Sequence, residues 1–138
     1  MKYFFDELDK IKKEISNISF WLLMLDFDGT LARIVSRPEN ANINFGIKKI
    51  LQQISKNSKI KIAIISGRDL KDIKIKIGIK GLVYSGNHGF EWQVGSKRFS
   101  VKPPKEYKEQ LNKIKKSLIK LSSNYKGSQL EDKVYSLS

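Results

Sequence analysis

The fold is constrained most strongly by the apolar run at residues 20–25, which is followed directly by two aspartates, Asp26 and Asp28. The run has the length of a strand and is too short to cross a bilayer, so it predicts a buried parallel strand in the middle of a sheet. Gly29 and Thr30 then turn the chain at the carboxyl end of this strand. Because ligands bind at that end of the strands in open α/β sheets, the two carboxylates are candidate site residues.

Two carboxylates on alternate residues have more than one interpretation. Acids this close at the end of a buried strand repel one another unless a cation or a phosphate chemistry requires both of them. Alternatively, an Asp-x-Asp-Gly turn only caps the segment that follows. A calcium-binding loop would need further oxygen ligands, and residues 31–35 offer none. The first two interpretations stay open from the residues alone.

Hydrophobic periodicity predicts further elements after this run. Two more parallel strands are expected at 60–65 and 82–85, and a hairpin with a Gly-Ser turn is expected over 90–101, its apolar residues alternating with Glu91 and Gln93. Amphipathic helices are expected at about 5–17, 47–54, 69–77 and 107–121. The first should pack beside the first strand. Asn44 and Asp69 are the expected caps of the second and third helices, and Gly78 should end the third. A turn and the start of a strand follow. This order predicts an α/β fold built on parallel βαβ units.

Three successive strands each end in a short polar turn that contains glycine, at residues 26–30, 66–68 and 86–89. Parallel strands have their carboxyl ends at one edge of the sheet, so these three turns should converge. This convergence is the main argument from the residues for a functional site.

Single side chains in these turns have alternative roles. Ser66 can donate a hydrogen bond to a phosphoryl oxygen, next to the free N–H groups of a helix that begins near Asp69, or it can be a helix cap. Arg68 can contact a substrate or form a structural ion pair. His88, the only histidine in the sequence, can contact a ligand or make a structural hydrogen bond.

The composition restricts the classes of function. The formal charge of +13 with 27 basic residues is compatible with nucleic-acid binding, but only four of those residues are arginines and the lysines are scattered over every predicted helix, so we expect no nucleic-acid partner. Without cysteine there is no disulfide, thiolate catalysis or cysteine-bound metal. No signal peptide or membrane span is visible, so we expect a cytoplasmic protein with no membrane partner.

Four motifs in this order resemble the trehalose-6-phosphate phosphatase family of the haloacid dehalogenase superfamily. They are D-F-D-G-T-L-A-x-I-V-x-x-P at 26–38 with Ala41, A-I-I-S-G-R at 63–68, G-N-H-G-F-E at 86–91 and L-E-D-K-x-x-S-L at 130–137. The first motif alone specifies only the superfamily. Sucrose and mannosylglycerate phosphatases share the fold but are less similar in the third and fourth motifs, and another sugar-phosphate phosphatase remains an alternative.

The resemblance implies a mechanism for the two aspartates. Asp26 would be the nucleophile that forms an aspartyl phosphate, and Asp28 would protonate the leaving sugar oxygen and then activate water. Mg²⁺ would be bound by the Asp26 carboxylate and the backbone carbonyl of Asp28, and the substrate would be trehalose 6-phosphate.

The resemblance also assigns the remaining candidate residues. Those that would bind the phosphate are Thr30, Ser66 and Gly67, and those that would bind the rest of the substrate are Arg68, His88, Glu131 and Lys133. The alternative for Glu131 and Lys133 is an exposed polar turn with no ligand. The implied fold is an incomplete haloacid dehalogenase-like (Rossmannoid) α/β sheet with the beginning of an α+β cap. A break at Lys102-Pro103-Pro104 predicts a boundary between a core at 1–103 and a cap segment at 104–138.

The sequence also departs from the family. Members continue beyond the fourth motif to a lysine that neutralises phosphate and to an acidic motif that completes the Mg²⁺ site, and neither occurs here. We therefore expect an amino-terminal portion with little hydrolysis of its own, or else a non-catalytic remnant or basic binding protein. In the family the first strand is central, so here we expect residues 20–25 on an open edge that pairs with a complementary chain or a second copy.

Overall fold

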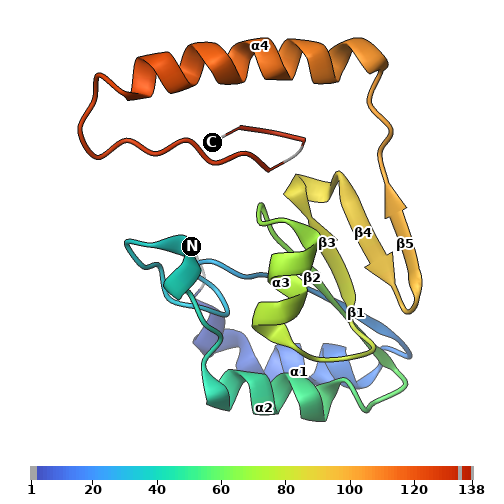
Figure 1. Cartoon of the computed structure of the whole chain (residues 1–138). Helices are drawn as coiled ribbons and strands as arrows, with labels where there is room; N and C mark the ends of the chain where they lie inside the picture. The colour runs from blue at the N-terminus through green and yellow to red at the C-terminus, as the bar shows by residue number, and fades with distance from the viewer. Residues whose placement is uncertain (1–2, 134, 138) are drawn as a thin grey trace.

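A five-stranded mixed sheet forms the centre of the computed structural model, which describes residues 3–133 and 135–137 (Figure 1). The strands lie in chain order, β1 (Trp21–Asp26), β2 (Ile60–Ile65), β3 (Val83–Gly86), β4 (Glu91–Val94) and β5 (Lys97–Ser100). β1, β2 and β3 are parallel, whereas β4 and β5 form an antiparallel hairpin on β3. The α/β class, the three parallel strands and the hairpin are therefore as predicted.

The helices between the parallel strands have the expected caps and ends, although α2 begins two residues before the expected start at 47. α2 (Phe45–Ile54) is capped by Asn44, whose Oδ1 accepts from the Gly46 N–H at 2.8 Å. α3 (Leu70–Ile77) is capped by Asp69, and it ends at Gly78 with a φ of 62°, the left-handed conformation that glycine adopts without strain. Leu51 of α2 and three residues of α3 pack with β2 and β3 in the core, namely Leu70, Ile73 and Ile77.

The first strand differs from the prediction in burial. β1 pairs only with β2 among the described residues and is therefore an edge strand, as expected, but it is not buried on both faces. Leu23 and Leu25 pack against the core, whereas Leu22 and Met24 are 54% and 61% exposed. A continuous apolar run predicts coverage on both faces, and here α2 and α3 pack against one face only.

The amino-terminal helix also differs from the prediction. It begins as a 3₁₀ turn, η1 (Phe4–Glu7), and continues as α1 (Leu8–Ser16). α1 has no buried residue, and Ile15 is 42% exposed. The expected packing beside β1 is therefore loose, and α1 contributes nothing to the core.

The carboxyl-terminal part forms a separate layer (Figure 1). α4 (Lys105–Ser122) lies on the side of the sheet away from α1 and α2, and the tail that follows runs back beneath it. Lys115 Nζ lies 2.6 Å from Asp132 Oδ2, and Tyr107 Oη donates to the Tyr135 carbonyl at 2.7 Å. The expected strand start is only an isolated bridge between Asp132 and Leu137 in the described residues, and positions 134 and 138 lie outside them.

Candidate active site

The three polar turns converge, as the parallel strands require. Asp26 lies beside Ile65 in the register of β1 and β2. The N–H of Ser66 donates to the Ser85 carbonyl at 3.0 Å, and the N–H of His88 donates to the Ser66 carbonyl at 3.1 Å. The ends of β1, β2 and β3 therefore form one continuous edge.

Asp26 and Asp28 lie at this edge and are both exposed. Phe27 between them has no exposed surface, and its burial in the core fixes the turn. Asp26 lines a cavity of about 530 Å³ together with Ser66, Gly67 and His88. The predicted nucleophile, two predicted phosphate-binding residues and the histidine are therefore brought together.

The turn after β2 has little freedom. Ser66 is buried, and its Oγ accepts from the Arg68 N–H at 3.1 Å, so it closes a local turn and is not the cap of α3. A Cβ on Gly67 would lie 2.5 Å from His88 Cε1, so the imidazole packs directly on the glycine backbone. His88 itself has a φ of 55°.

Glu91 is a site residue that the sequence analysis missed. Its Oε1 accepts from the Leu70 N–H at 3.2 Å and from Asn87 Nδ2 at 2.7 Å, and its Oε2 forms an ion pair with Arg98. This ion pair raises the pKa of the Arg98 guanidinium above its usual value. Glu91 thus joins the start of α3, the turn after β3 and the hairpin. Its alternation with Phe90 and Trp92 predicted only the hairpin, and its place in the third motif is the one signal in the sequence that could have marked it.

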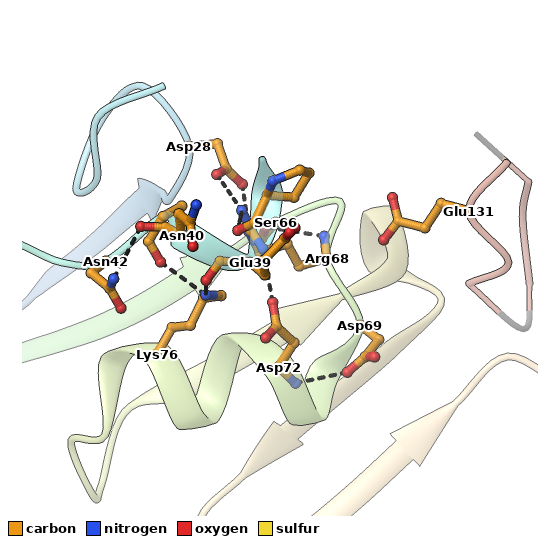
Figure 2. A network of polar contacts seen from close by, with 12 residues as sticks. Asp28, Glu39, Asn40, Asn42, Ser66, Arg68, Asp69, Asp72, Lys76 and Glu131 are labelled. Atoms are coloured by element: carbon orange, nitrogen blue, oxygen red, sulfur yellow. Dashed lines mark hydrogen bonds and ion pairs between the residues drawn. The ribbon is translucent and has the colours of Figure 1, made fainter. Parts of the chain in front are cut away.

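Arg68 is an ion-pair residue in this structure (Figure 2). Its guanidinium binds the carboxylates of Asp28 and Asp72, with shortest N–O distances of 2.8 and 2.9 Å. The hydrogen bonds to Asp28 raise the pKa of Arg68 above its usual value, burial opposes this shift, and the hydrogen bond to Asp72 adds to it. The structural alternative for Arg68 is therefore observed, and substrate contact stays a prediction.

Glu131 and Lys133 of the tail line a second cavity, of about 190 Å³, together with Asp28, Gly67 and Arg68. Lys133 Nζ lies 3.3 Å from Glu131 Oε2. Figure 2 shows the Glu131 carboxylate directed toward the side of the site where Arg68 lies. The tail thus faces the predicted catalytic residues, with Glu131 54% and Lys133 14% exposed, and both the sugar-binding role and the alternative of a polar turn without ligand stay predictions.

Thr30 lies elsewhere. It lines a third cavity, of about 430 Å³, with the segment that leads into α2, and neither of the cavities beside Asp26 and Asp28 includes it among its lining residues. Its proposed contact with phosphate stays a prediction.

The donor set fits a magnesium ion in part. Mg²⁺ prefers oxygen ligands and is commonly held by one or two carboxylates together with substrate phosphate and water. Asp26 offers an exposed carboxylate, and the Asp28 carboxylate is engaged by Arg68, which leaves its carbonyl as the second oxygen. Within residues 3–133 and 135–137, no group of three or more acidic, histidine or cysteine side chains is placed to hold a metal. These two residues fit the protein side of a site that substrate oxygens share.

Comparison with known proteins identifies the family. The trehalose-phosphatase family model matches residues 24–138, which is most of the chain. The chain belongs to the trehalose-phosphatase family. Over 69 residues it is 44% identical to a trehalose-phosphate phosphatase of Mycobacterium ulcerans and 45% identical to that of Mycobacterium leprae. These alignments cover 50% of this chain but only 17% and 16% of the two relatives.

Solved structures of this family have the same fold. The C-terminal domain of the Candida albicans trehalose-6-phosphate phosphatase superposes with a TM-score of 0.78 at 26% identity, over 91% of this chain and 44% of that one. A haloacid dehalogenase-like hydrolase from B. subtilis has a TM-score of 0.51 at 18% identity, over 75% of this chain and 33% of that one, which shows the fold alone. The chain therefore spans less than half the length of these proteins. No helix in the described residues is both long and apolar enough for a membrane span.

Proposed function

We propose that this chain carries the nucleophile, the acid–base residue and the phosphate-binding turns of a Mg²⁺-dependent phosphatase that hydrolyses trehalose 6-phosphate. The observation that carries the proposal is the cavity shared by Asp26, Ser66, Gly67 and His88 at the carboxyl edge of the sheet. Family membership and the similarity to mycobacterial trehalose-phosphate phosphatases support the choice of substrate.

In the proposed reaction an oxygen of Asp26 attacks phosphorus, and the bond between phosphorus and the sugar oxygen breaks. Asp28 donates its proton to that oxygen, so trehalose leaves as a neutral alcohol. Asp28, now a carboxylate, removes a proton from water, whose oxygen attacks phosphorus and releases Asp26 and inorganic phosphate. The contact between Arg68 and Asp28 fits this second step, in which Asp28 is an anion.

The remaining residues have binding roles in this proposal. The Ser66 hydroxyl and the backbone N–H groups near Gly67 would bind the phosphoryl oxygens, and Glu131 and Lys133 would bind sugar hydroxyls. The Asp26 carboxylate and the Asp28 carbonyl would hold Mg²⁺, which supplies charge neutralisation for the transferring phosphoryl group.

The test is phosphate release from trehalose 6-phosphate with Mg²⁺, compared with glucose 6-phosphate and sucrose 6-phosphate, by this chain fused to the carboxyl-terminal part of a family member, which supplies the lysine and the acidic motif. Asp26→Asn keeps the shape of the side chain but cannot form the acyl phosphate, so the rate should fall by several orders of magnitude. Asp9→Asn, an exposed acid of α1, is the control and should match the parent. A rate of Asp26→Asn within about tenfold of the parent would contradict the assignment of the nucleophile. Hydrolysis of all three sugar phosphates at equal rates would contradict the assignment of the substrate.

A further inference from the structure

The carboxylate of Asp28 is oriented by Arg68 (Figure 2). Arg68 Nε donates to Oδ2 and Nη2 donates to Oδ1, each at 2.8 Å. Two parallel bonds fix both the position and the plane of a carboxylate. The Asp28 side chain is 42% exposed, so packing alone does not restrict its rotation.

Arg68 is in turn fixed by other parts of the chain. Nη1 donates to Asp72 Oδ2 at 2.9 Å, Nη2 donates to the Pro38 carbonyl at 2.9 Å, and the guanidinium carbon lies 5.3 Å from the centre of the Phe27 ring. A guanidinium has five N–H groups, and these contacts with the two to Asp28 use four of them. Its side chain is only 12% exposed. Arg68 is therefore committed to contacts within the protein.

Among the described residues, Asp72 is the charged residue, apart from Asp28, that binds the Arg68 guanidinium. It lies in the first turn of α3, where its own N–H donates to Oδ1 of the cap residue Asp69 at 2.7 Å. The backbone of Asp72 is thus held at the start of a helix that packs in the core. Its carboxylate binds Arg68.

We infer that Asp72 is a positioning residue, which holds the Arg68 guanidinium in the orientation that aligns Asp28 for its two proton transfers. This inference rests on the proposed function, in which Asp28 moves those protons. Without the Asp72 carboxylate, the only contacts in the described residues that hold the Arg68 guanidinium, other than those with Asp28 itself, are with the uncharged Pro38 carbonyl and Phe27 ring. The guanidinium and the Asp28 carboxylate can then rotate together. A displacement of about 1 Å at a reacting group lowers rates by as much as two orders of magnitude.

The first test measures the contact itself and requires no catalysis. Selective ¹⁵N labelling of arginine gives one Nε–H signal for each of the four arginines of the chain, at 33, 37, 68 and 98. We expect Asp72→Ala to accelerate exchange of the Arg68 Nε–H with water roughly tenfold, in the same direction as Asp28→Ala, and Asp72→Asn to have a smaller effect. Asp9→Ala is the matched control and should leave the signal unchanged. An Arg68 signal as protected in folded Asp72→Ala as in the parent would overturn the inference.

The second test separates positioning from substrate binding. In the same fused enzyme with trehalose 6-phosphate, Asp72→Ala should lower kcat roughly tenfold and leave KM within about a factor of two, because an oriented proton donor acts in the transition state. A raised KM with an unchanged kcat would show that Asp72 binds the substrate itself and would also overturn the inference. If the fused enzyme does not hydrolyse trehalose 6-phosphate, the proposed function fails, while the exchange experiment still decides whether Asp72 holds Arg68.

Discussion

Glu91→Ala removes the side chain that joins three parts of the site, and we expect it to destabilise the fold strongly. Its two carboxylate oxygens accept from the Leu70 N–H, from Asn87 Nδ2 and from Arg98. Leu70 and Asn87 are each 1% exposed, so water does not replace the lost acceptor for them. Arg98 is 62% exposed and returns to water when Glu91 is removed.

These exposed fractions determine how far the free energy of unfolding should fall. Each buried N–H group that loses its acceptor costs about 1–3 kcal/mol, whereas the exposed end of the ion pair contributes less than about 1 kcal/mol. The two buried donors therefore dominate, and we expect the free energy of unfolding to fall by about 3 kcal/mol. For a chain of this size, that loss corresponds to a decrease in Tm of about 10 °C.

Urea unfolding followed by tryptophan fluorescence measures this decrease in the free energy of unfolding. Glu91→Gln keeps one acceptor for Leu70 and Asn87 and should lose less than half as much stability as Glu91→Ala. Adding Arg98→Ala to Glu91→Ala should cost little more, since Arg98 has no buried role once Glu91 is gone. A free energy of unfolding for Glu91→Ala within about 0.5 kcal/mol of the parent would refute this account of the network.

Three further changes test other parts of the fold. Gly86→Ala would place a Cβ 2.5 Å from the Leu70 backbone nitrogen, and because backbone cannot rotate away, we expect a loss of about 2–3 kcal/mol in urea unfolding. Asn44→Ala removes the cap of α2 and should lower the free energy of unfolding by about 1 kcal/mol. Burial raises the pKa of the Tyr84 phenol above its usual value of 10.0, so above that pH the unfolded chain loses this proton first and the stability falls as pH rises. The difference in free energy of unfolding between the parent and Tyr84→Phe should therefore change between pH 9 and pH 11, and an unchanged difference would contradict the linkage.

The element order and the converging turns could be predicted because local chemistry determines them. Asn44 and Asp69 cap their helices as their side chains dictate, and Gly78 ends α3 in the left-handed conformation. The convergence of the turns follows from parallel strands alone. For these features the residues and their spacing are sufficient.

Burial and partner choice could not be predicted in the same way. The alternation around Glu91 predicted a hairpin but not the burial of Glu91, which is 4% exposed because its partner at the start of α3 comes from a distant part of the chain. Leu22 and Met24 indicated a strand buried on both faces, yet they are exposed. The partnership of Arg68 with Asp72, four residues later, has helical spacing and could have been found, whereas its bond to Asp28 depends on the sheet register.

The tail is joined to the hairpin in two ways, through a stiff connection to α4 and through a pair of stacked rings. The Val101 N–H donates to the Phe90 carbonyl at 2.8 Å, and Pro103 and Pro104 follow after one residue. Each proline fixes its own φ and restricts the backbone of the residue before it, so the connection is stiff. The rings of Phe90 and Tyr135, stacked with centroids 5.8 Å apart, join the hairpin to the tail. Lifting the tail away from the hairpin therefore requires these two rings to separate.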